Sequence, residues 1–293
     1  MINGKDVLGA IIEHEVQLAS VNAMPEEGDY KEGDVLCCGK CRTPKECFVN
    51  MFGGVVKVPC MCKCKSEEYE NAQQRMKEET ERIELQNRRG NCFDSLKMLD
   101  YTFEKCIVKD DPLYQTALAY SENFKDMLED GKGLMFFGDT GNGKSYFAAA
   151  IANKVLDQGY TCRMTNFATI EIEANADYRN RGDYIKELTN VDLLIIDDLA
   201  AERSTETMQQ FVQNVIDRRY ITHKPLIVTT NLTANELKEK NDIAKKRLYS
   251  RLMGMTIPIC FEGKDLRISE LKAAYDKYKD MLYLPDRKKK GTQ

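Results

Sequence analysis

The sequence predicts an α/β fold, a parallel sheet sandwiched by helices, with a small cysteine-rich module and a helical connector ahead of it. Apolar runs at residues 134–137, 191–196 and 225–230 have the length and composition of strands buried on both faces. Stretches with helical composition separate these runs, as the crossovers between parallel strands require. Seven of the eleven cysteines fall between residues 37 and 64, which sets the amino-terminal part of the chain apart.

The cysteine-rich segment has the spacing of a zinc site. Cys38 and Cys41 form a C-x-x-C pair that presents two thiolates to one tetrahedral ion, and a second group of cysteines follows eighteen residues later. In a reducing compartment this pattern indicates zinc and not disulfides. Cys64 could replace Cys62 in the site, Cys37 is a bystander, and a set of packed or redox-active thiols is the alternative. The ligands expected first are Cys38, Cys41, Cys60 and Cys62.

A connector follows the cysteine-rich module. Residues 66–89 are charged and rich in glutamate with few helix breakers, which predicts an exposed helix that ends at Gly90. Residues 91–130 are mixed in character and contain Tyr101 and Phe103. We expect this stretch to open the next domain.

Residues 138–145 have the spacing G-x-x-x-x-G-K-[ST] of a phosphate-binding loop, directly after the first apolar run. The glycines let the backbone fold around a phosphate chain, with N–H groups pointing inward at the start of the following helix. Lys144 is placed to reach the β- and γ-phosphates, and Ser145 to ligate Mg²⁺. A glycine loop that only turns the chain is the alternative. The expected nucleotide-binding residues are Gly138, Asp139, Thr140, Gly141, Asn142, Gly143, Lys144 and Ser145.

Two carboxylates end the second apolar run, as in a Walker B motif. Asp197 is expected to hold Mg²⁺, directly or through water, and Asp198 to polarise the attacking water. Many P-loop ATPases have Glu at the second position, so the shorter Asp198 predicts slow turnover. For Asp198 the alternative is a cap on the next helix.

Further polar residues follow the third run. Asn231 is placed to orient the lytic water or to contact the γ-phosphate. Arg247 and Arg251 are four residues apart and share one helix face. Either could act as an arginine finger on the nucleotide of a neighbouring subunit, which would make hydrolysis depend on assembly. Arg267 is a weaker candidate for a γ-phosphate sensor, and a solvated basic helix face is the alternative for the arginines.

With these motifs the chain resembles the AAA+ ATPases of the DnaC/DnaI helicase-loader group over residues 96–270. This group is close kin to the IstB transposition ATPases and to the replication initiator DnaA. The resemblance implies that Asn231 is sensor 1 and that Arg251 is the finger, with Arg247 as the second choice. The segments that carry the resemblance are Asp197–Glu206, Asp217–Tyr220, Thr229–Leu232 and Ser250–Leu252.

The resemblance also implies where DNA and the base bind. An extra helix between the second strand and Walker B would cover residues 167–188, where Phe167, Tyr178, Arg179 and Arg181 combine aromatic faces with positive charge, as single-strand binding needs. Buried apolar residues and solvated arginines are the alternative. The segment before the phosphate-binding loop is expected to wall the adenine.

Composition sets the domain count and compartment. The 293 residues are 42% hydrophobic and 31% charged, which is enough for one full α/β domain and a smaller module. The expected division is a zinc module at 1–66, a connector at 67–95, the ATPase domain at 96–285 and a basic tail at 286–293. The net charge of −4 gives no global basic field, so any DNA contact must be local. No apolar run reaches membrane-spanning length and no signal segment begins the chain, so a cytoplasmic protein is expected.

The function that the resemblance implies is an ATP-dependent loader of a hexameric, DnaB-type replicative helicase onto single-stranded DNA, of phage or prophage origin. The implied cofactors are ATP, Mg²⁺ and Zn²⁺. The implied partners are the helicase, single-stranded DNA and further copies of the chain, with no membrane. The cysteine module favours the loader over an IstB-like ATPase partner of a transposase. The other alternative is a non-hydrolysing, nucleotide-switched zinc adaptor.

Overall fold

A computed structural model describes residues 23–51, 54–176, 181–199, 206–232, 236, 243–262 and 265–282. The chain divides into two compact units, residues 1–83 and residues 84–293, and each is described by itself.

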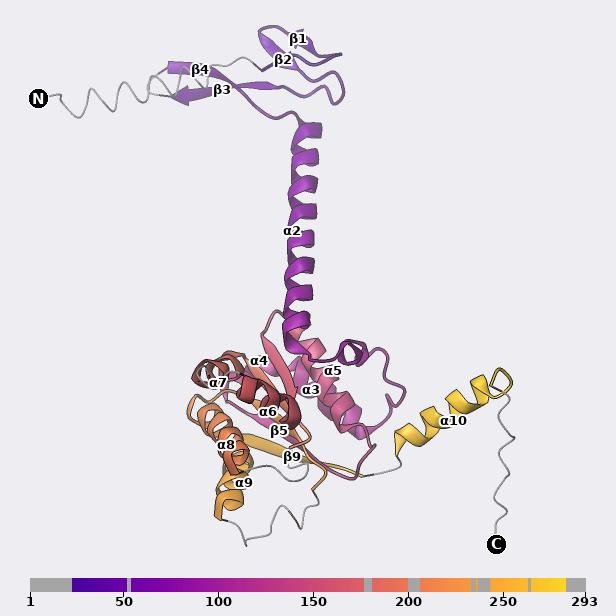
Figure 1. The fold of residues 1–293 in the computed structure, drawn as a ribbon. Coiled ribbons are helices and arrows are strands. Elements are labelled where there is room, and N and C mark those ends of the chain that lie inside the picture. Colours follow the sequence, from indigo (N-terminus) through magenta and orange to yellow (C-terminus); the bar gives the residue numbers. More distant parts are fainter. Residues whose placement is uncertain are drawn as a thin grey trace, which may run out of the picture. The chain divides into compact units, whose positions relative to one another are not determined.

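The amino-terminal unit contains two antiparallel hairpins (Figure 1). In the first hairpin Glu32 pairs with Val35, which leaves a two-residue turn that begins at Gly33. Gly33 has φ of +62°, the left-handed conformation that such turns need. The four strands are β1 (Tyr30–Glu32), β2 (Val35–Cys37), β3 (Glu46–Met51) and β4 (Gly54–Pro59).

Buried ion pairs and hydrogen bonds stabilise this unit. Lys45 is only 5% exposed, and its ammonium group pairs with Asp29 at 2.6 Å and with Glu26 at 3.1 Å. Glu46 is buried as well and accepts a hydrogen bond of 2.8 Å from the backbone N–H of Leu36. Few apolar side chains are buried among the described residues of this unit. A module with so small an apolar core needs an additional stabilising cross-link, such as a bound metal ion.

The predicted exposed helix is present as α2 (Lys63–Cys92), and the boundary between the two units lies within it. The helix continues two residues past Gly90, where it was expected to end. Gly90 has open space around it, whereas Cys92 and Phe93 just beyond are buried in the second unit. The gain from burying these side chains outweighs the cost of about 1 kcal/mol for a glycine within a helix.

The second unit is built on a five-stranded sheet in the order β6-β7-β8-β5-β9, with every neighbouring pair parallel. The three apolar runs form β5, β7 and β8, so the predicted fold class is confirmed. The strands are β5 (Gly133–Gly138), β6 (Cys162–Asn166), β7 (Leu193–Asp197), β8 (Leu226–Thr229) and β9 (Thr256–Phe261).

Helices cover both faces of this sheet (Figure 1). In β7, Leu193 and Ile195 join the core cluster that contains α5, whereas Leu194 and Ile196 join the cluster that contains α8 and α9. This alternation is the period of two expected of a strand buried on both faces. The remaining helices are η1 (Leu96–Asp100), α3 (Pro112–Glu122), α4 (Phe124–Glu129), α5 (Lys144–Asp157), α6 (Phe167–Ala176), α7 (Arg181–Asn190), α8 (Glu206–Ile221), α9 (Ile243–Met255) and α10 (Leu266–Tyr278).

Within the described ranges, no helix has both the length and the apolar character needed to cross a bilayer.

Candidate functional site

The phosphate-binding loop joins the end of β5 to the start of α5. Gly138, Gly141 and Gly143 have φ of +121°, +83° and +91°, a region that residues with a side chain rarely adopt. At Gly138 a side chain would also clash with the backbone carbonyl of Phe261 on the neighbouring strand. The loop therefore needs glycine at these positions, which is the arrangement that lets backbone N–H groups surround a phosphate.

A cavity of about 510 Å³ opens at this loop. Its volume lies in the range of small-molecule sites. It brings together the loop, the end of β7 and the residues after β8, which are far apart in the sequence. The sequence-predicted residues that line it are Thr140, Gly141, Gly143, Lys144, Ser145, Asp198 and Asn231.

Asp197 is fixed by two hydroxyl groups at the end of β7. The Ser145 hydroxyl donates to its Oδ1 at 2.8 Å, and the Thr229 hydroxyl donates to the same oxygen at 2.5 Å. Burial raises the pKa of Asp197, and these two hydrogen bonds oppose the rise in part. A divalent cation would favour the charged carboxylate. The neighbouring carboxylate and hydroxyl oxygens are ligands that suit Mg²⁺, so the residues fit the ion.

Asp198 is held in a different way. It has φ of +59°, and its backbone N–H donates to the Thr229 hydroxyl at 2.8 Å. The Asn231 side-chain amide donates to Asp198 Oδ1 at 2.7 Å. A left-handed conformation is uncommon for a residue with a side chain, and such conformations cluster at functional sites. The amide contact orients the carboxylate at the edge of the cavity, where an attacking water would need it.

Lys144 and Asn142 hold the loop in shape. Lys144 is 6% exposed, and its ammonium group donates to the carbonyl oxygens of Gly138 at 2.8 Å and Asp139 at 2.5 Å. Asn142 is buried and donates from its side chain to the carbonyl oxygen of Phe261 at 3.1 Å. The ammonium group therefore lies at the phosphate loop, whereas the Asn142 side chain braces the loop against β9.

An aromatic pair also lines the cavity. The rings of Tyr101 and Tyr146 lie 4.7 Å apart, and the Lys97 ammonium group lies 5.7 Å from the Tyr101 ring centroid. Phe103 is instead buried, with its ring edge-to-face with Tyr114. Sequence reasoning missed Lys97 and Tyr146. Tyr146 could have been found, because it comes directly after the last residue of the loop motif and must lie at its rim.

The structure does not bring the two candidate finger arginines to this cavity. Arg251 forms an ion pair with Asp217 of α8, and Arg247 is exposed on α9. The backbone of Arg267 lies in α10, but its side chain is outside the described residues, as are those of Phe167 and Arg181. Tyr178, Arg179 and the basic tail are outside them entirely.

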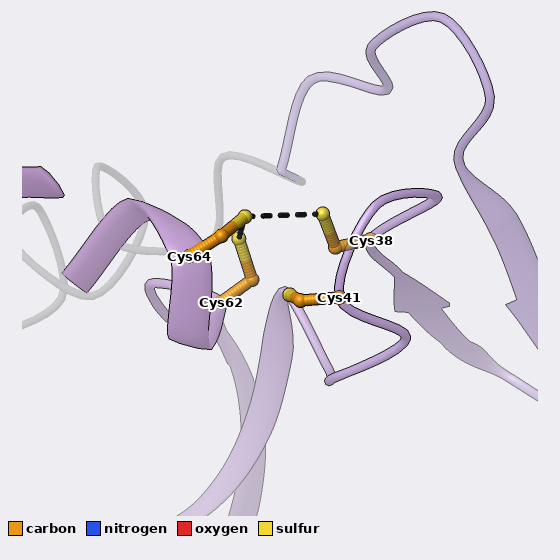
Figure 2. Close-up of side chains that lie close together, drawn as sticks. All are labelled: Cys38, Cys41, Cys62 and Cys64. Atoms are coloured by element: carbon orange, nitrogen blue, oxygen red, sulfur yellow. Dashed lines mark hydrogen bonds between the residues drawn. The ribbon is translucent and has the colours of Figure 1, made fainter. Parts of the chain in front are cut away.

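Four cysteines of the amino-terminal unit converge on one point (Figure 2). The sulfur atoms of Cys38, Cys41, Cys62 and Cys64 all lie within 4.8 Å of one another. Cys38 and Cys64 are 3.6 Å apart, and Cys62 and Cys64 are 3.4 Å apart. Tetrahedral Zn²⁺ with four thiolates at about 2.3 Å places sulfur atoms roughly 3.8 Å apart. The cluster therefore fits a closed, structural zinc site.

This cluster corrects the set expected first, since it contains Cys64 and leaves out Cys60. The Cys60 thiol points to the carbonyl oxygen of Pro44 at 3.7 Å. Cys60 directly follows the last residue of β4, so it stays beside the hairpin, whereas Cys62 and Cys64 lie where the chain turns into α2. Cys37 is buried outside the cluster.

The surroundings of the four thiols push their pKa values in opposite directions. The backbone N–H of Cys41 lowers the pKa of Cys38, and the Thr43 hydroxyl lowers that of Cys41 to about 5. The neighbouring Cys62 thiol, above all, raises the pKa of Cys64 to about 12. Four thiolates cannot coexist so closely without a compensating charge, which a divalent cation supplies.

The parallel sheet, the glycine loop at the start of α5 and the adjacent carboxylates at the end of β7 define a P-loop nucleotide-binding protein. The family model for IstB-like ATP binding proteins matches residues 67–248. The chain therefore belongs to the family of IstB-like ATP-binding proteins.

Among the curated relatives, YdaV of Escherichia coli (strain K12) is 30% identical over 126 residues, 42% of this chain and 51% of YdaV. The replicative helicase loader DnaC of the same organism is 27% identical over 156 residues, 52% of this chain and 61% of DnaC. The replicative helicase loader DnaI of Bacillus subtilis (strain 168) is 24% identical over 188 residues, 58% of this chain and 59% of DnaI. The chain thus spans between about half and three-fifths of the length of these relatives.

Proposed function

We propose that this protein is an ATPase that loads a hexameric, DnaB-type replicative helicase onto single-stranded DNA in the cytoplasm. The observation that carries the proposal is the chain of contacts from Ser145 through Asp197 and Thr229 to Asp198, at the rim of a cavity of nucleotide size. The printed names of DnaC and DnaI, both replicative helicase loaders, support the choice of partner.

In the proposed reaction the loop N–H groups and Lys144 bind the phosphates of ATP. Ser145 and Asp197 would hold Mg²⁺, which would supply positive charge to offset the charge of the phosphates. Asp198, oriented by the Asn231 amide, accepts the proton of the attacking water. Lys97, Tyr101 and Tyr146 supply the wall against which the base packs.

In this proposal a neighbouring copy of the chain supplies a further positive charge to the site. We infer that an arginine of α9 in a neighbouring copy stabilises the transferring phosphoryl group. Arg251 is preferred over Arg247, because the segment Ser250–Leu252 resembles the loader group. The ion pair of Arg251 with Asp217 would then have to open. The chain would therefore work as an oligomer, with slow hydrolysis that depends on assembly.

The amino-terminal unit supplies the contact with the helicase in this proposal. The cysteine cluster would hold Zn²⁺ and fix the two hairpins, which then present a rigid surface to the partner. ATP-bound domains would assemble and hold the helicase ring open, and hydrolysis would release it.

The proposal is tested with a helicase and a closed circular single strand that carries an annealed oligonucleotide. A closed helicase ring cannot thread onto a circle, so displacement of the oligonucleotide reports loading. We expect displacement with wild-type protein and ATP, and none with Lys144→Ala, which removes the charge that faces the phosphates. Lys154→Ala, on the same helix α5, is the matched control. No displacement with a helicase that the protein binds would contradict loading.

The family description favours one further candidate, an IstB-like ATPase partner of a transposase. The two functions differ in the DNA that stimulates hydrolysis. A loader responds to single strands, whereas the transposase partner responds to double strands. ATPase activity that single-stranded DNA stimulates and that is lost in Asp198→Asn would exclude the remaining alternative, a nucleotide-binding switch without hydrolysis.

A further inference from the structure

The chain that leaves β9 runs against the phosphate-binding loop. The parallel register of β5 and β9 pairs Gly138 with Phe261, the last residue of β9. The Asn142 side chain donates to the Phe261 carbonyl oxygen at 3.1 Å and is itself 8% exposed. The end of β9 is therefore held against the loop, and the chain leaves this strand beside the nucleotide cavity.

A carboxylate lies at this point. A Cβ atom built on Gly141 would lie 2.6 Å from Oδ2 of Asp265 and closer still to its Oδ1, so the Asp265 carboxylate occupies the space into which a side chain at position 141 would project. Gly141 lines the cavity, its φ of +83° would strain a residue with a side chain, and the Asp265 carboxylate fills the space that a side chain would need. Asp265 is the residue directly before α10.

The placement is unusual for a loop that binds anions. The N–H groups of a phosphate-binding loop and the start of the following helix attract negative charge. When the cavity holds no nucleotide, this positive electrostatic potential stabilises the carboxylate at the rim of the loop. The negative charge of this carboxylate next to Gly141, which lines the cavity, also disfavours the negatively charged phosphates of a nucleotide that binds there, because like charges repel even in a partly solvated site.

We propose that Asp265 sets the nucleotide affinity of the P-loop and links it to α10. The carboxylate occupies the rim of the loop without nucleotide, weakens the binding of polyphosphates, and is displaced together with the first turn of α10 when ATP binds. The proposal rests on nucleotide binding at the loop. It adds a residue and an element that the proposed ATPase mechanism does not use.

The test compares Asp265→Asn with wild type in the equilibrium binding of ATP, ADP and AMP at low ionic strength. Asparagine keeps the size and removes the charge. We expect ATP to bind roughly five- to tenfold more tightly, ADP less so, and AMP almost unchanged, with the gain shrinking as salt is added. Glu262→Gln, an equal change of charge on an exposed residue just after β9, is the matched control and should leave ATP affinity unchanged.

Unchanged or weaker ATP binding in Asp265→Asn would overturn the proposal, and so would an equal gain in Glu262→Gln. In either case wild-type ATP binding would still support the nucleotide site. If the wild type itself fails to bind ATP, both the nucleotide site and this proposal fail.

Hydrogen exchange gives the second measurement. We expect ATP to speed amide exchange in residues 266–270 of the wild type, because Asp265, directly before α10, loses its contact with the loop. In Asp265→Asn the same amides should exchange faster before ATP is added. Exchange that is identical with and without ATP would exclude displacement of α10.

Discussion

Arg251 is the residue whose role depends most on assembly. The structure pairs it with Asp217 of the same chain, so a loss of activity on substitution has two explanations. The first is a finger that acts on the nucleotide of a neighbouring copy. The second is an ion pair that only positions α9 on α8.

We predict that Arg251→Ala binds ATP almost normally and hydrolyses it about 10³-fold more slowly. Asp217→Asn, which breaks the same ion pair and keeps the arginine, should retain most activity. Mixing Arg251→Ala with Asp198→Asn should restore part of the activity, because some interfaces then pair an intact arginine with an intact carboxylate. No recovery in assemblies shown to be mixed would assign Arg251 to its own chain.

Substitution of single cysteines can test which thiols bind the metal. We predict that wild-type protein binds about one equivalent of zinc, and that Cys64→Ser binds less than half an equivalent because one of four sulfur ligands is lost. Cys60→Ser should keep its zinc, since this thiol lies outside the cluster. Metal analysis of the purified proteins decides the point, and equal loss in both variants would contradict the four-cysteine cluster.

At the scale of elements, one buried arginine joins α8 to the starts of two strands. Arg219 is fully buried and donates to the carbonyl oxygens of Thr189 at 3.1 Å, Val191 at 2.6 Å and Asp192 at 2.9 Å. It also donates to Pro225, just before β8. Burial lowers its pKa to about 10, so it remains charged near neutral pH. The guanidinium satisfies carbonyl groups that would otherwise be buried without a partner.

We predict that Arg219→Met destabilises the second unit by about 2–4 kcal/mol, because several buried carbonyl groups lose their donor. Arg218→Met is the matched control, since the neighbouring side chain is exposed on the same helix. Urea unfolding of the two variants measures the difference. Equal stability would mean that water replaces the guanidinium without cost.

At the scale of the whole molecule, the two units are expected to fold separately. A chain that lacks residues 1–66 keeps all of α2 after its first turn and the complete P-loop unit. We predict that it binds ATP as the full chain does and no longer binds the helicase, since separate cores fold separately. Circular dichroism, ATP binding and a pull-down with the helicase test this. Retained helicase binding would place the interface on the P-loop unit.

The sequence was sufficient for features that depend on local pattern. The apolar runs predicted β5, β7 and β8, and the residues that end them meet at one cavity because the strands are parallel. The sequence was insufficient for contacts that depend on how two strands pair or on where the chain changes direction. The choice between Cys60 and Cys64 depends on how β4 passes into α2, and the position of Asp265 depends on the pairing of β5 with β9.

The packing of β7 has a consequence for how this chain can change over evolutionary time. All four residues of 193–196 are apolar and buried. A shift of the strand by one residue would therefore still place apolar side chains on both faces of the sheet. That shift would break the hydrogen bonds of Asp197 with Ser145 and Thr229, because it would move the carboxylate to the opposite face. Exchanges among leucine, isoleucine and valine should therefore be common within this strand in related chains, whereas gains or losses of a single residue should be almost absent.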